Sequence, residues 1–318
     1  MPTRNGKKAV TKAVLRLTAS GKQFGQVSLG AFLLDPPLDL TPPAPRLGLA
    51  AAYPGDVGVE RDKNVLLAEH FESSSWTRNW SYARPPGTHE VVSEDESLKF
   101  QPLRGRALRV NVEKGKHLGL NAGYRFRGKQ GSEPEEIYFR YYLRFADDWH
   151  QTREGGKMPG IAGTYDKGGW GGRKADGLNG WSMRGGFSKV IPEGHPYAGG
   201  TALSTYAYHA RAQSKYGAHW PWSDGRPGIL RNNRWYCIEQ YFRVNMPGAD
   251  DGVLRVWLDG VLAFERTDIR VRDIDSIKIE QIWLNIYHGG TAVSPRDQHV
   301  YIDNAVIARS YIGPMRAP

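Results

Sequence analysis

The chain has 318 residues and a formal net charge of +10, with 43 Lys and Arg against 33 Asp and Glu. A hydrophobic content of 40% and a charged content of 24% are ordinary for globular proteins and exclude wholesale disorder. A single Cys excludes a disulfide framework, and no apolar run is long enough for a membrane helix, so we expect no insertion into a membrane. The basic charge predicts a polyanionic partner.

The first 63 residues form a separate segment in our prediction. Short apolar runs at 14–18 and 27–34 are typical of a β-hairpin, and a Pro-rich linker follows at 35–45. This segment is too small to hold a full core of its own. We therefore expect a small N-terminal β appendage with its linker over 1–63 and one main catalytic domain over 64–318.

The N-terminus lacks a clean secretory signal. Basic residues cluster there, but Arg16 and Lys22 break the apolar stretch that should follow them. The residues alone leave two interpretations open, namely export through a segment outside this chain or an intracellular location.

From residue 64 onward the pattern is strand after strand, divided by turns rich in Gly and Pro. No stretch of ten or more residues has a helical period. This pattern predicts an all-β fold, a β-jelly-roll sandwich of concanavalin-like type. The predicted strands cover residues 106–112, 136–146, 181–187, 203–210, 234–245, 252–265, 276–287 and 299–309.

Alternation along these strands predicts one buried face and one face rich in Tyr, Trp, Arg and amide side chains. Such a face suits sugar rings, because rings stack on aromatics while hydroxyls and carboxylates need hydrogen-bond donors. The alternative is that these aromatics pack against loops. The outward residues that we predict to contact a sugar are Arg140, Tyr142, Glu239, Tyr241, Gln281, Trp283, Asn285 and Tyr287.

Two further candidate contacts stand beside glycines. Trp170 lies within the Gly-rich run 168–172, which we predict to be a mobile loop over the cleft with Trp170 as a stacking platform. This run is no nucleotide-binding loop, because it lacks the Lys-Ser/Thr pair and a following helix. His288 precedes the pair Gly289-Gly290 and is predicted to close one end of the cleft.

Three segments in the middle of the chain carry residues for chemistry. Lys157 stands between glycines in what we predict to be a tight loop. Ser182 and Arg184 are two residues apart on one predicted strand and so share a face, as do Tyr206 and Tyr208 on the next strand. Together these segments place two cations, a hydroxyl and two phenols on one concave sheet.

This set suits β-elimination on a uronate polymer. Arg184 neutralises the C5 carboxylate, which acidifies the C5 proton, and Ser182 orients the substrate or Lys157. A base then takes that proton and an acid protonates the departing glycosidic oxygen. Tyr206 or Tyr208 is the preferred acid and base, provided that a nearby cation lowers its pKa, with Lys157 as the rival base. Because protein cations neutralise the carboxylate, we expect no required metal or other cofactor.

The same residues resemble a known family. Lys157-Met-Pro-Gly, Trp181-Ser182-Met-Arg184 and Tyr206-Ala-Tyr208 are similar to the active-site strands of polysaccharide lyase family 14, the alginate and polyuronate lyases of jelly-roll fold. The resemblance covers residues 64–312. It implies Lys157, Ser182, Arg184, Tyr206 and Tyr208 as the catalytic group. It further implies alginate or a glucuronan-like polymer as substrate and a secreted or periplasmic protein.

Other functions fit the sequence less well. A structural Ca²⁺ at Asp303-Asn304 is a weaker interpretation than a capped turn. A glycoside hydrolase needs two close carboxylates, and the strand pattern that supplies them is incomplete here. Nucleic acid is not an expected partner, because the basic residues are spread along the chain without a recognition motif. The alternative that stays open is a non-catalytic, lectin-like carbohydrate-binding module.

Overall fold

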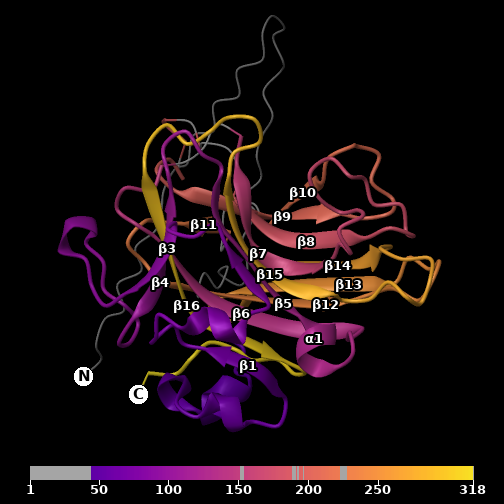
Figure 1. The fold of residues 1–318 in the computed structure, drawn as a ribbon, viewed down its shortest axis with the longest axis horizontal. Coiled ribbons are helices and arrows are strands. Elements are labelled where there is room, and N and C mark those ends of the chain that lie inside the picture. Colours follow the sequence, from indigo (N-terminus) through magenta and orange to yellow (C-terminus); the bar gives the residue numbers. More distant parts are fainter. Residues whose placement is uncertain are drawn as a thin grey trace, which may run out of the picture. The chain divides into compact units, whose positions relative to one another are not determined.

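The computed structural model describes residues 44–317, apart from 151–153, 188–190, 192, 196 and 223–227. The predicted N-terminal hairpin lies outside the described residues. The described chain forms two antiparallel sheets in two layers, with few and short helices (Figure 1). This architecture confirms the predicted all-β jelly-roll sandwich. No helix in the described part of the chain is long and apolar enough to cross a membrane.

Sheet 1 has the strand order β14-β13-β12-β6-β16-β4-β3, with β1 paired to β16. Its strands are β1 (Val65–Glu69), β3 (His89–Val92), β4 (Ala107–Val112), β6 (Glu136–Phe145), β12 (Tyr236–Arg243), β13 (Gly252–Leu258), β14 (Val261–Ile269) and β16 (Gln298–Ala308).

Sheet 2 has the strand order β10-β9-β8-β7-β15-β5-β2, with β11 paired to β9. Its strands are β2 (Tyr82–Arg84), β5 (Leu118–Arg125), β7 (Gly156–Gly163), β8 (Trp181–Phe187), β9 (Thr201–Tyr208), β10 (Ala218–Pro221), β11 (Ile229–Leu230) and β15 (Gln281–His288).

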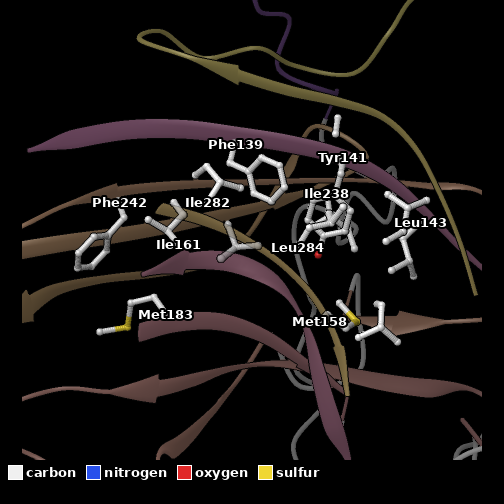
Figure 2. Packing of buried hydrophobic residues seen from close by; sticks show 14 of the residues in the cluster. Phe139, Tyr141, Leu143, Met158, Ile161, Met183, Ile238, Phe242, Ile282 and Leu284 are labelled. Atoms are coloured by element: carbon white, nitrogen blue, oxygen red, sulfur yellow. The ribbon is translucent and has the colours of Figure 1, made fainter. Parts of the chain in front are cut away.

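The core lies between the two sheets. Apolar residues at every second position of β6, such as Phe139 and Leu143, face Ile282 and Leu284 of β15 (Figure 2). All four side chains are fully buried, as the alternation predicts. The opposite faces of β6 and β15 therefore point away from the core. The outer face of β6 is covered by other segments, whereas that of β15 lines a cavity.

The outer face of sheet 1 is covered by the two ends of the described chain. Short 3-10 helices η1 (Leu49–Ala52), η2 (Pro54–Asp56) and η3 (Val59–Arg61) precede β1. Ala50 and Val59 pack there with Val306 and Ile312. These helices lie in the same compact unit as the sandwich. The remaining helices are η4 (Trp76–Asn79), η5 (Glu96–Leu98) and α1 (Phe126–Gln130).

The predicted strands at 106–112, 136–146 and 181–187 match β4, β6 and β8. The single strand predicted at 252–265 is wrong, because Asp259 and Gly260 adopt positive φ angles of 50° and 80° and turn the chain between β13 and β14. Strands β5 and β7 were not predicted, since Gly, Asn and Pro interrupt their apolar pattern. Lys157 consequently lies on strand β7 and not in the predicted loop.

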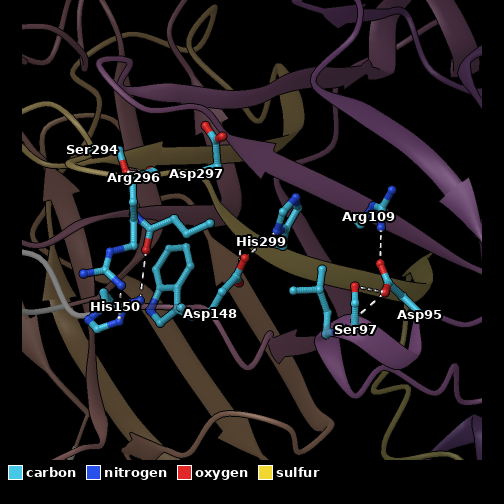
Figure 3. A network of polar contacts seen from close by, with 12 residues as sticks. Asp95, Ser97, Arg109, Asp148, His150, Ser294, Arg296, Asp297 and His299 are labelled. Carbon is cyan, nitrogen blue, oxygen red and sulfur yellow. Dashed lines mark hydrogen bonds and ion pairs between the residues drawn. The ribbon is translucent and has the colours of Figure 1, made fainter.

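A polar network fixes one end of the sandwich. The carboxylate of Asp148 accepts the backbone N–H of His299 and lies 2.7 Å from its Nδ1, while Arg296 contacts His150 (Figure 3). On the neighbouring strand β4, Arg109 pairs with Asp95. The network thereby ties the segment that follows β6 to the first residues of β16.

Candidate active site

The outer face of sheet 2 holds a cavity of about 670 Å³. The predicted site residues that line it are Lys157, Trp170, Arg184, Tyr206, Tyr208, Trp283, Asn285 and Tyr287. Another cavity, of about 270 Å³ beside α1, has Arg309 as the one cation among its described lining residues and contains none of the predicted site residues. The cavity on sheet 2 is therefore the candidate active site.

Strand register brings the central residues of the cavity together. Arg184 of β8 pairs with Tyr206 of β9, and Lys157 of β7 pairs with both Gly186 of β8 and Tyr287 of β15. Paired residues share a face of the sheet. Because Gly186 has no side chain, it places no atoms beyond its backbone beside Lys157 on this face. The Lys157 Nζ atom lies 4.7 Å from the ring centre of Tyr206 and 5.0 Å from that of Tyr287.

Lys157 is a partly desolvated amine. Its Nζ donates a hydrogen bond to the carbonyl of Gly289 at 3.3 Å. Burial, together with the positive charge of Arg184, lowers the pKa of Lys157 to about 8 against the opposing effect of Glu154. Within the described residues it forms no ion pair with a carboxylate. An appreciable fraction of Lys157 is therefore neutral near neutral pH and able to accept a proton.

Arg184 is a buried guanidinium without a counter-ion among the described residues. Its Nη1 donates to Asn285 Oδ1 at 3.2 Å, and its Cζ lies 4.4 Å from the ring centre of Trp283. Burial lowers the pKa of Arg184 to about 10. A buried charge that lacks an opposite charge destabilises the fold unless something neutralises it. The arrangement therefore suits an anionic ligand in the cavity.

Each of the two tyrosines is held by a glycine of a neighbouring turn. The hydroxyl of Tyr206 accepts the N–H of Gly217 at 3.2 Å, and that of Tyr208 accepts the N–H of Gly172 at 3.1 Å. Each phenol can still donate its own proton. Burial raises the pKa of Tyr206 and outweighs the opposing effect of Arg184. The positive charge of Arg184 does act to lower the pKa of Tyr206, but burial has the larger effect, so the pKa is raised overall and Tyr206 is protonated at neutral pH.

Ser182 lies beneath the cavity and does not line it. It is fully buried, and its Oγ donates to the carbonyl of Gly169 at 2.6 Å. This bond holds the turn that carries Trp170, on whose ring Arg173 stacks with its Cζ 3.9 Å from the ring centre. The structure thus places Ser182 under the turn and not in contact with Lys157 or the cavity, contrary to the expected orienting role.

Four predicted sugar contacts lie on sheet 1 instead, namely Arg140, Tyr142, Glu239 and Tyr241. Arg140 is fully buried in an ion pair with Asp56 of η2. The Glu239 carboxylate accepts the backbone N–H groups of Ile312 and Gly313. Alternation correctly predicted that these four side chains point away from the core, but the ends of the described chain cover the outer face of sheet 1. These residues therefore anchor the covering segments and do not face the cavity.

Two predicted contacts on β15 also lie outside the cavity lining. Gln281 is buried and accepts a hydrogen bond from the hydroxyl of Tyr82 at 2.8 Å. His288 is buried at the end of the strand and is not among the residues that line the cavity. Asp303 and Asn304 lie inside β16 at a register shift rather than in a capped turn. Among the described residues, no group of three or more His, Cys, Asp or Glu is arranged to hold a metal ion.

Several cavity residues were not predicted from the sequence. His219 of β10 pairs with Tyr206, and their ring centres lie 4.8 Å apart. Glu154 accepts backbone N–H groups of the turn at 290–292, including that of Ala292 at 2.9 Å, and these bonds lower its pKa to about 2. His219 could have been found from its place in a short aromatic segment before Pro221. No sequence pattern identifies Glu154, because its hydrogen-bond partners are mostly backbone groups.

Comparison with known proteins gives one family. Residues 103–305 match the family model described as Polysaccharide lyase 14. The structure of alginate lyase Aly36B is similar with a TM-score of 0.58 and 20% identity, over 79% of this chain and 98% of that one. No curated protein matches the chain.

Two further solved structures show the same fold. The marine PL-14 alginate lyase from Aplysia kurodai has a TM-score of 0.56 and 20% identity, over 76% of this chain and 98% of that one. The endo-β-1,4-glucuronan lyase from the fungus Trichoderma reesei has a TM-score of 0.50 and 14% identity, over 75% of this chain and 95% of that one.

Proposed function

This chain belongs to polysaccharide lyase family 14 and is a polysaccharide lyase, and from this premise we propose that it cleaves an alginate or glucuronan-like polyuronate by metal-independent β-elimination. The observation that carries the proposal is the pair of cations, Lys157 and Arg184, which face one cavity and form no ion pair with a carboxylate among the described residues. Family membership favours this enzyme over the lectin-like alternative. A mutant of Aly36B, which shares the fold, has been solved in complex with an alginate tetrasaccharide.

In this proposal Arg184 binds the carboxylate at C5 of the uronate. The amide of Asn285 fixes the guanidinium, because its Oδ1 accepts from Arg184 while its Nδ2 donates to the carbonyl of Leu120 at 3.0 Å. A positive charge that is already in place when negative charge develops lowers the barrier without reorganisation. Protein cations thus supply the electrostatic stabilisation that a metal ion supplies in other enzymes.

Lys157 serves as the base and Tyr206 as the acid in the proposed step. Neutral Lys157 takes the C5 proton, and the electron pair of the C5–H bond forms the C4–C5 double bond. The bond from C4 to the glycosidic oxygen breaks, and that oxygen takes the proton of Tyr206. The lowered pKa of Lys157 and the raised pKa of Tyr206 support this division of roles. The N–H of Gly217 then stabilises the phenolate that remains.

Ultraviolet absorbance during incubation with separate polyuronates tests the proposed function. Elimination leaves an unsaturated uronate that absorbs, whereas hydrolysis does not. We expect a rising signal on polymannuronate, polyguluronate or glucuronan, unchanged by a chelator, and none on polygalacturonate, hyaluronan or heparin. New reducing ends without absorbance would reject elimination, and a signal abolished by the chelator would reject metal independence.

The pH dependence of kcat/KM is expected to follow Lys157. A base must be deprotonated to act, so kcat/KM should rise up to tenfold per pH unit below about 8 and level off above it. The raised pKa of Tyr206 keeps the acid protonated throughout this range. Initial rates at low substrate between pH 5 and pH 10 provide the measurement. A profile that is flat or falls from pH 6 to pH 9 would assign the base to another group.

Replacing Gly217 with Ala is expected to lower kcat with little change in KM. A Cβ at Gly217 would lie 3.0 Å from Tyr206 Cζ, from Tyr208 Cδ2 and from the carbonyl oxygen of Ala207, so the rings or the turn must give by a few tenths of an ångström. A small displacement of catalytic groups costs about ten- to a hundredfold in rate. The control is Gly128→Ala in α1, where the added Cβ meets nothing within 4 Å. Equal activity of the two variants would contradict the role of Gly217.

A further inference from the structure

The cavity face of sheet 2 continues to its edge strand β2. Asn285 of β15 pairs with Asn121 of β5, and Asn121 pairs with Arg84 of β2. Asn285 and Asn121 line the cavity. Because residues paired across strands share a face, Arg84 lies on the cavity face of the sheet, one strand beyond Asn121. Ala83, the neighbour of Arg84, packs against the core, as the alternation requires.

Arg84 is an exposed cation held by an aromatic ring. Its Cζ lies 5.3 Å from the ring centre of Tyr82, and the Cζ of Arg125 lies 5.4 Å from the same ring. The Tyr82 hydroxyl is fixed by its bond to Gln281. Tyr82 is therefore a rigid support for two guanidinium groups.

The two guanidinium groups differ in their partners. Arg125 has carboxylates nearby, since its side-chain nitrogens lie 3.5 Å from Asp166 and 3.8 Å from Glu280. Arg84 forms no ion pair with any carboxylate in the described part of the chain. Of this pair, Arg84 is thus the cation that is available to an anionic ligand.

We propose that β2 forms a second carboxylate-binding subsite of the cleft, in which Arg84 pairs with a uronate carboxylate several sugar rings from the bond that is cut. The subsite rests on the proposed function, because it takes the same polyuronate chain. Tyr82 and Gln281 act as positioning residues for Arg84.

The position of Arg84 sets an expected dependence on substrate length. Four strand spacings separate Arg184 on β8 from Arg84 on β2. At about 4.8 Å per spacing, the two guanidinium-bearing strands are about 19 Å apart along the sheet. A short oligosaccharide at the catalytic cations does not reach Arg84, whereas the polymer does. Arg84 therefore contributes to binding of long chains alone.

Kinetics of Arg84→Gln on substrates of defined length test the subsite. With the polymer we expect KM to rise about three- to tenfold while kcat stays unchanged, and with a trisaccharide we expect no change. Arg84→Lys should restore part of the affinity. The control is Arg104→Gln, which removes the same charge from an exposed position before β4 of sheet 1. Equal KM values for Arg84→Gln and Arg104→Gln on the polymer would overturn the subsite. An equal rise in the KM of Arg84→Gln on trisaccharide and polymer would overturn it as well.

Equilibrium binding separates failure of the subsite from failure of the proposed function. Polyuronate affinity is compared between Lys157→Ala and the double variant Lys157→Ala/Arg84→Gln, in both of which cleavage is expected to be too slow to consume the polymer during the measurement. Weaker binding of the polymer by the double variant supports the subsite, whether or not the wild-type protein produces absorbance. A lack of absorbance with the wild-type protein would reject only the proposed elimination. Equal binding by both variants rejects the subsite, whatever the activity of the wild-type protein. Thermal unfolding verifies that all variants are folded.

Discussion

Replacing Lys157 with Ala is expected to lower kcat/KM by about a thousandfold, which lies within the usual effect of losing a general base. The neutral amine of Lys157 stands beside the ring of the proposed acid Tyr206, with its pKa already lowered to about 8. The Ala variant keeps Arg184, so substrate binding should persist while proton removal fails. Initial rates of absorbance increase on the preferred polyuronate provide the measurement.

Two further variants separate the base from the charge of Lys157. Lys157→Arg keeps a positive charge but not a group that deprotonates near neutral pH, so it should be nearly as inactive as Lys157→Ala. Lys129→Ala removes an exposed Lys of α1 and should leave the rate unchanged. If Lys157→Ala retains more than about a tenth of the activity, Lys157 is not the base, and Tyr206 or Tyr208 takes that role.

The sequence predicted the architecture because the signals for it are local. Alternation in β6 and β15 identified the core faces, and turn residues divided most strands correctly. The candidate site was also predictable in part, since Ser182 and Arg184, or Tyr206 and Tyr208, share a face by spacing alone. That Arg184 and Tyr206 pair across β8 and β9 follows from register, which the sequence does not specify on its own.

The errors have a common physical cause. Arg140 and Glu239 lie on an outward face as predicted, but segments far away in the chain cover that face and bury both residues. Alternation cannot distinguish a face covered by remote segments from a face that is open. Ser182 shows the same limit at a single residue, because its partner is the carbonyl of Gly169, a backbone group that no side-chain pattern reveals.

Replacing Arg184 with Met is expected to stabilise the protein while it removes most of the activity. Arg184 is 6% exposed and has no counter-ion among the described residues, so the fold bears the cost of desolvating its charge. An apolar side chain of similar length removes that cost and should raise the free energy of unfolding by about 1–3 kcal/mol. Loss of the cation that faces the substrate carboxylate should lower kcat/KM by about a hundred- to a thousandfold. Urea unfolding and initial rates measure the two effects.

Arg140→Met is the matched control for this prediction. It makes the same chemical change at a buried Arg, but here the removed cation leaves Asp56 buried without its partner. The expected result is a loss of stability of about 3–5 kcal/mol, opposite in sign to the effect of Arg184→Met. Opposite signs of the two stability changes would mean that Arg140 is retained for the fold and Arg184 for the substrate. Arg140 stabilises the fold through its ion pair with Asp56, whereas Arg184 destabilises it because its buried charge has no counter-ion among the described residues. If Arg184→Met instead destabilises the protein as Arg140→Met does, Arg184 stabilises the fold. That result would contradict the proposal that Arg184 binds a substrate carboxylate in the cavity.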